Sequence, residues 1–183
     1  MNSSDQLQMM VYAALFAALT AVGAFLAIPI GPVPIVLQNM FVYLAGLLLG
    51  SRWGLASVGV YLLAGACGLP VFAGGLGGIG RLIGPTGGYL IGYLPTVFCI
   101  GKISARTHPG IVFDVLAMIS GSIILYACGI TGLKLVTGMT LAKAFAVGMF
   151  PFLLGDAVKI AAAAAIAKTM RPIIRVKPYT SLS

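Results

Sequence analysis

Long apolar runs constrain this chain more than any other feature of its sequence. Hydrophobic residues fill 60% of the 183 positions, charged residues fill only 8%, and glutamate is absent. The mean hydropathy is +1.10. This composition excludes an ordinary soluble domain and favours membrane-spanning helices, which satisfy their own backbone hydrogen bonds in lipid. At about 20 residues per span, the length allows roughly six spans, in one membrane domain over residues 1–183.

Turn-forming residues divide the apolar sequence into six predicted transmembrane helices. A proline-rich turn follows the first run, GSRWG follows the second, and the glycine-rich segment AGGLGGIGRLIGPTGG (73–88) follows the third. Thr86 is placed to cap the fourth helix, and Pro109 is placed to begin the fifth. The predicted spans cover residues 7–28, 35–49, 55–72, 87–102, 109–130 and 151–170. The expected fold is therefore an all-α integral membrane protein with an irregular glycine-rich outer loop.

The last apolar stretch, residues 140–170, is too long for one ordinary span and contains Pro151. Proline is tolerated in the first turn of a helix and disrupts its interior. We therefore expect a short interfacial helix over 140–149, followed by a final span that begins at Pro151. Asp156 and Lys159 would then lie about 8 and 12 Å along that span, in one half of the membrane.

Asp156 and Lys159 are two opposite charges inside an otherwise apolar predicted helix. Ionisable groups at such depth are costly and are most often functional. Their spacing of three residues places both side chains on one helix face, where a single polar ligand could contact both. The alternative is an ion pair whose members only neutralise each other.

The basic residues predict the orientation of the chain. One side of a six-span arrangement collects Arg52, Lys102, Arg106, Lys168, Arg171, Arg175 and Lys177, and the other side collects Arg81, Lys134 and Lys143. An excess of basic residues marks the cytoplasmic side, so both termini are expected there, with residues 171–183 as a basic tail. These loop charges also account for the net charge of +8, so no nucleic-acid partner is expected. The glycine-rich loop, the first loop and the Asp156 end of the last span would face outward together.

Further polar residues on this outer side are candidates for a binding site. Arg81, the only charge in the glycine-rich segment, either sets orientation or binds a ligand carboxylate. Gln38 and Asn39 begin the second span about 100° apart around the helix, so we expect only one of them to face a pocket. Tyrosines could line the same cavity or lie at the membrane interface, and the candidates are Tyr43, Tyr89 and Tyr93.

No residue pattern predicts a catalytic or metal site. The cysteines Cys67, Cys99 and Cys128 lie in separate apolar runs, and His108 lies in a polar connection. GGLGGIG lacks the preceding strand and the following Gly-Lys-Ser/Thr of a nucleotide-binding loop. Asp156 and Lys159 could in principle act as acid and base, but no second catalytic group accompanies them. We therefore expect neither a cofactor, an ATP site nor an enzymatic activity.

The first predicted helix carries alanines at four-residue spacing in two registers, Ala13–Ala17–Ala21 and Ala14–Ala18. Small residues spaced in this way let another helix approach closely. The alanines either pack within the bundle or form a docking face for another subunit.

Three segments together resemble the BioY family of biotin-binding proteins, the substrate-capturing S components of energy-coupling factor (ECF) vitamin transporters. They are GPVPIVLQNMFVYLAGLLLG (31–50), GLPVFAGGLGGIGRLIGPTGGYLIGY (68–93) and PFLLGDAVK (151–159). Asn39 departs from the family, which more often has threonine after the glutamine.

The resemblance implies a six-helix protein of a prokaryotic cell (inner) membrane that captures biotin with high affinity in an outward-facing pocket. A membrane T component and two ATPase subunits would supply the energy, and the alanines of the first helix would dock on the T component. The substrate-binding residues would be Asp156, Lys159, Arg81, Gln38, Asn39, Tyr89 and Tyr43. The alternative is a stand-alone biotin carrier that works without ATPase partners.

Overall fold

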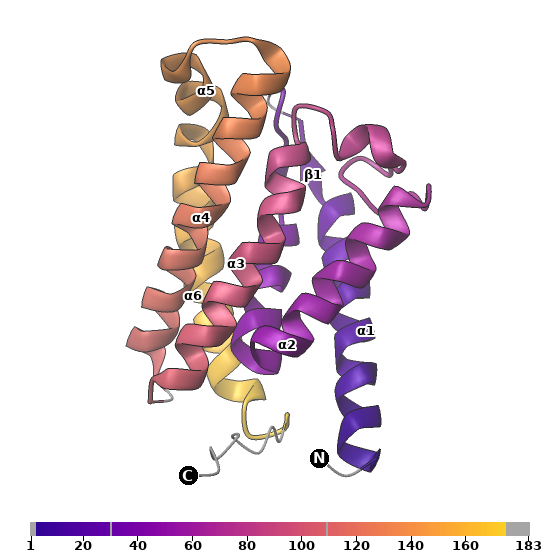
Figure 1. The fold of residues 1–183 in the computed structure, drawn as a ribbon. Coiled ribbons are helices and arrows are strands. Elements are labelled where there is room, and N and C mark those ends of the chain that lie inside the picture. The colour runs from indigo at the N-terminus through magenta and orange to yellow at the C-terminus, as the bar shows by residue number, and fades with distance from the viewer. Residues whose placement is uncertain (1–2, 30, 109, 175–183) are drawn as a thin grey trace.

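A computed structural model describes residues 3–29, 31–108 and 110–174 of the chain. It is a bundle of helices whose long axes run broadly in one direction (Figure 1). In the described part of the chain, five helical segments are long and apolar enough to cross a membrane. The helical segments are α1 (Ser3–Phe25), α2 (Gln38–Ala66), η1 (Ile79–Arg81), α3 (Gly87–Arg106), α4 (Ile111–Thr137), α5 (Leu141–Gly148), η2 (Phe150–Phe152) and α6 (Leu153–Met170). The protein is thus a mostly helical, multi-pass membrane protein.

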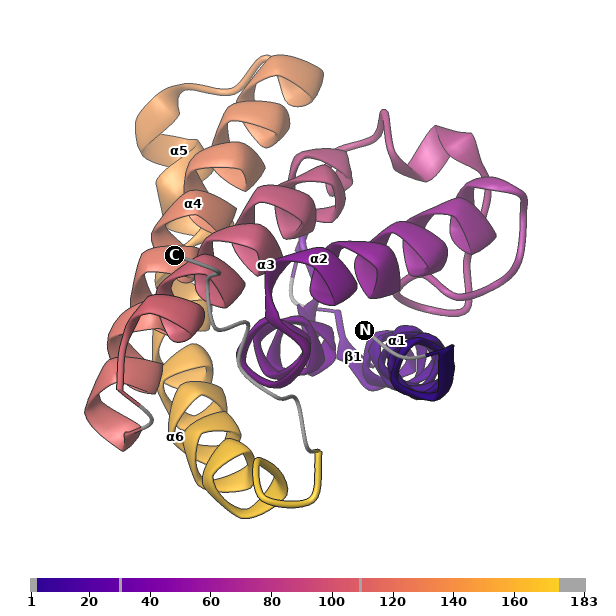
Figure 2. The same ribbon diagram turned by 60° about the horizontal axis from the view of Figure 1, so that its bottom comes forward.

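α2 contains both the second and the third predicted spans. The backbone of Gly50 lies outside the helical region, with φ 74° and ψ −176°, and so divides α2 into two helical parts. The two parts run in clearly different directions (Figure 2). The predicted boundary therefore falls at a single glycine, which adopts a positive φ without a Cβ penalty. The second part ends at Ala66, six residues before the predicted end of the third span at residue 72.

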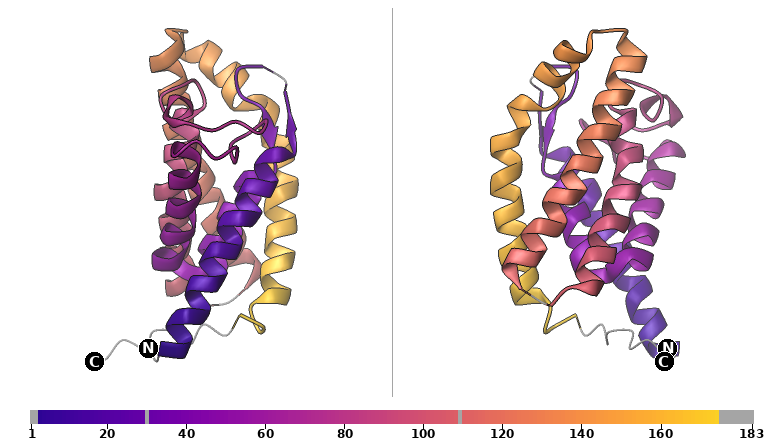
Figure 3. Two further views of the ribbon diagram at one scale, coloured as in Figure 1. Left: turned by 90° about the vertical axis from the view of Figure 1, so that its right-hand side faces the viewer. Right: turned by 60° about the vertical axis from the view of Figure 1, so that its left-hand side comes forward.

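A short β-hairpin corrects the all-α prediction. β1 (Ala27–Ile28) pairs antiparallel with β2 (Ile35–Val36) across the proline-rich turn. α1 consequently ends at Phe25 instead of residue 28. The hairpin lies at the same end of the bundle as α5 and the segment between α2 and α3 (Figure 3).

The remaining boundaries differ from the prediction by a few residues. α3 continues to Arg106, and α4 continues to Thr137, where Gly138 in the left-handed conformation ends it. Thr86 occupies the N-cap position of α3, but its side chain makes no capping hydrogen bond. Pro109 lies outside the described residues, as does most of the predicted basic tail.

The predicted division at Pro151 is confirmed. α5 covers Leu141–Gly148, and Pro151 lies in η2, immediately before α6. Thr140 caps α5 by accepting a hydrogen bond from the Lys143 backbone N–H. Because η2 redirects the chain, Asp156 falls in the first turn of α6, where the helix dipole favours a negative charge.

Glycine contacts bring α3 close to α4. A Cβ on Gly88 would lie 2.5 Å from the carbonyl oxygen of Cys128, and a Cβ on Gly132 would lie 2.7 Å from the Cα of Gly88. Neither position can carry a side chain without moving the helices apart. This contact lies at the end of the bundle where α3 begins and α4 ends, and small residues there let the two helices approach closely.

Candidate binding site

A cavity of about 350 Å³ opens among the hairpin, the segment between α2 and α3, and the adjoining parts of α2, α3, α4 and α6. Its volume lies in the usual range for small-molecule sites. The polar side chains that line it are Gln38, Asn39, Arg81, Thr86, Tyr89, Tyr93, Tyr126, Asp156 and Lys159. Apolar side chains that line it include Val33, Phe72, Leu90, Leu125 and Phe152. The cavity therefore combines an apolar wall with a small set of convergent polar groups.

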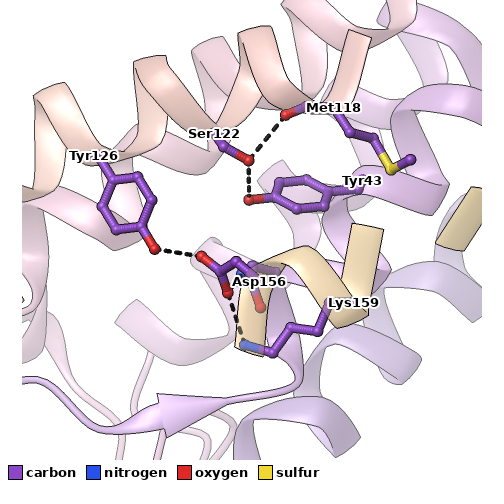
Figure 4. Close-up of polar contacts among 7 residues, drawn as sticks. Tyr43, Met118, Ser122, Tyr126, Asp156 and Lys159 are labelled. Carbon is purple, nitrogen blue, oxygen red and sulfur yellow. Dashed lines mark hydrogen bonds and ion pairs between the residues drawn. The ribbon is translucent and has the colours of Figure 1, made fainter. Parts of the chain in front are cut away.

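Asp156 is the centre of the polar groups in this cavity. Its side chain receives hydrogen bonds from three donors, each on a different residue. Two of these residues, Tyr126 and Lys159, are labelled beside it in Figure 4. Asn39 Nδ2 lies 2.9 Å from Oδ1, and Lys159 Nζ lies 3.0 Å from the same oxygen. The hydroxyl of Tyr126 donates to the other oxygen, Oδ2. These donors compensate a carboxylate that is only 6% exposed.

Lys159 forms an ion pair with Asp156 across one turn of α6 and is itself only 7% exposed. A lysine ammonium has three donors, so this single bond to the carboxylate leaves two for other acceptors. Arg81, in η1, is the other basic residue among the described lining residues. Its side chain makes no hydrogen bond or ion pair within the described residues, so its guanidinium is available to an anion at the cavity wall.

Gln38 and Asn39 both line the cavity, which corrects the expectation that only one of them faces it. They are the first two residues of α2, and the cavity covers this end of the helix. Side chains that point in two neighbouring directions therefore both reach the cavity. Gln38 Nε2 donates to the hydroxyl of Tyr61 at 2.8 Å. Asn39 Oδ1 is buried and has no hydrogen-bond partner within the described residues.

Tyr89 lines the cavity and donates its hydroxyl proton to the carbonyl oxygen of Gly148 at 2.6 Å. Its ring packs directly on Gly129, where a Cβ would lie 2.1 Å from a ring carbon. Tyr43 is fully buried and is not among the lining residues. Its hydroxyl instead lies 2.8 Å from Ser122 Oγ, behind the cavity wall (Figure 4).

Tyr93, one of the tyrosines expected at the cavity, lines it, and so does Tyr126, which was not a candidate. Tyr126 lies well inside the long apolar helix α4, away from either end. A tyrosine at that depth needs a partner for its hydroxyl, and this position could have identified it in the sequence. The aromatic side chains of Phe72 and Phe152 had no comparable signal, because apolar residues surround them in the sequence.

The two alanine registers of α1 have different surroundings. Ala13 and Ala17 are buried against the bundle and Ala21 is half-buried, whereas Ala14 and Ala18 are exposed. The register that contains Ala13 therefore serves internal packing, and the other register leaves a small-residue surface uncovered.

A second ion pair, with a buried carboxylate and a partly exposed guanidinium, joins the start of α4 to the residue that follows α6. Arg171 donates to both oxygens of Asp114, at 2.6 and 3.0 Å, and to Ser104 Oγ at 3.4 Å. Asp114 is in the first turn of α4. This pair does not line the cavity, so it ties the helix ends together without contributing to the site.

Comparison with known proteins gives consistent matches over almost the whole chain. The BioY family model matches residues 1–176. A biotin transporter BioY of Thermotoga maritima is 38% identical over 167 residues, which cover 91% of this chain and 98% of that protein. A probable biotin transporter BioY of Pyrococcus horikoshii is 42% identical and covers 86% of this chain and 93% of its own length.

The fold is similar to a solved crystal structure, that of the S component for biotin from an ECF-type ABC transporter. The TM-score is 0.88 at 33% sequence identity, and the match covers 94% of this chain and 95% of the other. Sequence and fold agree over the same length. The chain belongs to the BioY family.

Proposed function

We propose that this chain captures biotin with high affinity and carries it into the cell as the S component of an ECF-type transporter. The observation that carries the proposal is the compensated Asp156–Lys159 pair in the wall of a ligand-sized cavity. The family and the named relatives are transporters, so the chain is a transport protein and not an enzyme.

The chemistry of biotin matches the groups that line the cavity. Its ureido ring has an N–H donor for Asp156 and a carbonyl acceptor for the free donors of Lys159. Its sulfur-containing ring is apolar and suits Phe72 and Phe152. Its carboxylate suits Arg81, which has no counter-charge within the described residues.

The remaining polar residues have supporting roles in this proposal. Gln38, Asn39 and Tyr89 line the cavity and can reach a ligand directly. Tyr43 lies behind the wall and holds α2 against α4 through Ser122. It therefore acts on the ligand only through the position of its neighbours.

We place six spans in the cell (inner) membrane, with the two parts of α2 counted separately. The kink at Gly50 supports this count. The excess of basic residues supports cytoplasmic termini, and the cavity then opens to the outside. The Ser3 end of α1 and the Met170 end of α6 lie together at one end of the bundle, away from the hairpin (Figure 3).

Energy for uptake would come from a T component and two ATPase subunits. The exposed Ala14 and Ala18 on α1 are the proposed docking surface, because Ala13 and Ala17 are already packed inside the bundle. Close helix approach needs small residues on an uncovered face.

A binding assay on the purified protein tests the proposal, with biotin, riboflavin and thiamine as competing ligands. We expect saturable binding of biotin that neither other vitamin displaces. Saturable binding of another vitamin, with none of biotin, would refute the substrate. Biotin uptake by cells that express this chain without any T component would refute the need for partners and favour a stand-alone carrier.

A further inference from the structure

The acceptor capacity of Asp156 is almost fully used by the protein itself. A carboxylate offers about four lone-pair sites, two on each oxygen. Oδ1 receives Asn39 Nδ2 and Lys159 Nζ, which fills both of its sites. Oδ2 receives the hydroxyl of Tyr126, so one site on Oδ2 remains. Asp156 can therefore accept one further hydrogen bond from a ligand, not two.

The orientation of the Asn39 amide follows from its contact with Asp156. The reverse orientation would place two oxygens 2.9 Å apart, so the nitrogen must face the carboxylate. The amide oxygen then faces elsewhere. It is buried, on a side chain that is 5% exposed and lines the cavity, and it accepts nothing within the described residues.

Tyr43, one turn along α2, cannot supply a donor to this oxygen. Ser122 Oγ lies 2.9 Å from the carbonyl oxygen of Met118, which can only accept, so the serine proton is used there. The contact between Tyr43 and Ser122 must then use the tyrosine proton (Figure 4). With these directions, Asn39 Oδ1 is an acceptor that lacks a donor within the described residues.

We propose that the two N–H groups of one ligand are divided between Asp156 Oδ2 and Asn39 Oδ1, so that Asn39 determines specificity in this site. Within the proposed function, the ligand is the cyclic urea of biotin. The two N–H bonds of a five-membered cyclic urea diverge, so one carboxylate cannot accept both. A second acceptor on a different residue satisfies the second donor, and a buried acceptor without a donor costs free energy until a ligand fills it.

Two biotin derivatives, each methylated at one ureido nitrogen, test the division. The measured quantity is the methylation penalty, the dissociation constant of each derivative divided by that of biotin. It is determined for the wild type and for Asn39→Leu, which keeps the branched shape of the side chain, at a somewhat larger volume, and removes both polar atoms. We expect Asn39→Leu to raise the dissociation constant for biotin about tenfold. The methylation penalty should fall at least about fivefold at the nitrogen whose N–H donates to Asn39. It should remain unchanged at the other nitrogen, since Asp156 still accepts that N–H.

If Asn39→Leu disturbs folding, Asn39→Ala is the second variant, and we expect the same pattern of penalties from it. Thr96→Val is the control, because it removes another buried hydrogen bond, from Thr96 to Gly121, outside the cavity. Its penalties should equal those of the wild type.

Unchanged penalties in both Asn39 variants would overturn the inference. Equal falls at both nitrogens would also overturn it, because Asn39 would then act only by holding Asp156. A wild-type protein that binds no biotin would refute the proposed function itself, and that result is obtained before any variant is compared.

Discussion

Replacement of Asp156 by asparagine changes the cavity by one charge and one acceptor atom with almost no change in shape. The amide can keep its oxygen toward Asn39 and Lys159, where two donors converge. Its NH₂ group then replaces Oδ2, and the hydroxyl oxygen of Tyr126 can accept from it. The protein therefore retains three hydrogen bonds, but the open acceptor site becomes a donor.

The loss of ligand affinity follows from this exchange. A hydrogen bond to a charged group contributes about 1.5–3 kcal/mol, which corresponds to roughly 10- to 150-fold in affinity. A ligand N–H would in addition face the new N–H, so we expect Asp156→Asn to lie at or beyond the upper end of this range. Stability should also fall, because Lys159 is only 7% exposed and loses its counter-charge. Breaking a buried ion pair costs about 3–5 kcal/mol of unfolding free energy.

Calorimetric titration of biotin into the detergent-solubilised protein measures the affinity, and thermal unfolding measures the stability. Asp114→Asn is the matched control. It makes the same substitution in a second ion pair, which joins the end of α4 that lies away from the cavity to Arg171, the residue that follows α6. We expect this control to lower the unfolding temperature and to leave the biotin affinity within about twofold of the wild type, because neither Asp114 nor Arg171 lines the cavity.

Two results would refute the reasoning. If Asp156→Asn binds biotin as tightly as the wild type, the carboxylate does not contact the ligand. If Asp114→Asn weakens biotin as much as Asp156→Asn does, the effect is one of general stability and gives no evidence for a contact.

Three further substitutions test other parts of the proposal. In competition binding, Arg81→Gln should lower the affinity for biotin by roughly tenfold or more and should change the affinity for biotin methyl ester little. Equal losses for the two ligands would contradict a contact between Arg81 and the biotin carboxylate. Gly129→Ala should lower the unfolding free energy by about 1–3 kcal/mol in thermal denaturation, because the added Cβ meets the Tyr89 ring at 2.1 Å, and unchanged stability would contradict this packing. Ala14→Phe should reduce co-purification of the T component while biotin affinity is kept, whereas Ala13→Phe should destabilise the protein itself, and full recovery of the T component with Ala14→Phe would exclude this docking register.

Local patterns in the sequence predicted the features that depend on near neighbours along the chain. The division at Pro151 followed from the steric demand of proline, and the structure has α5 before it and α6 after it. The break between the second and third spans was placed near Gly50, where the structure has a non-helical glycine inside one continuous element. In both places the conformational preference of a single residue determines the local backbone conformation.

Features that depend on contacts between distant segments were not predicted. The hairpin forms because residues 27–28 meet residues 35–36, and nothing in its two-residue strands has a strand-like alternation. The alanine registers of α1 look equivalent in sequence, and only the neighbouring helices decide that Ala13 is buried while Ala14 is exposed. Likewise, the sequence could not show that Tyr43 points behind the wall rather than into the cavity.

The sequence by itself determined that this chain is a membrane protein of apolar helices and that Asp156 and Lys159 share one face of the last helix. Both results follow from composition and from the 3.6-residue period of the helix. Only the tertiary structure decided what that face meets. It brings Asn39 from 117 residues away and Tyr126 from 30 residues away onto the same carboxylate. No local rule predicts such partners, because the packing of whole helices brings them together. These partners determine how many acceptor sites of the Asp156 carboxylate remain for a ligand.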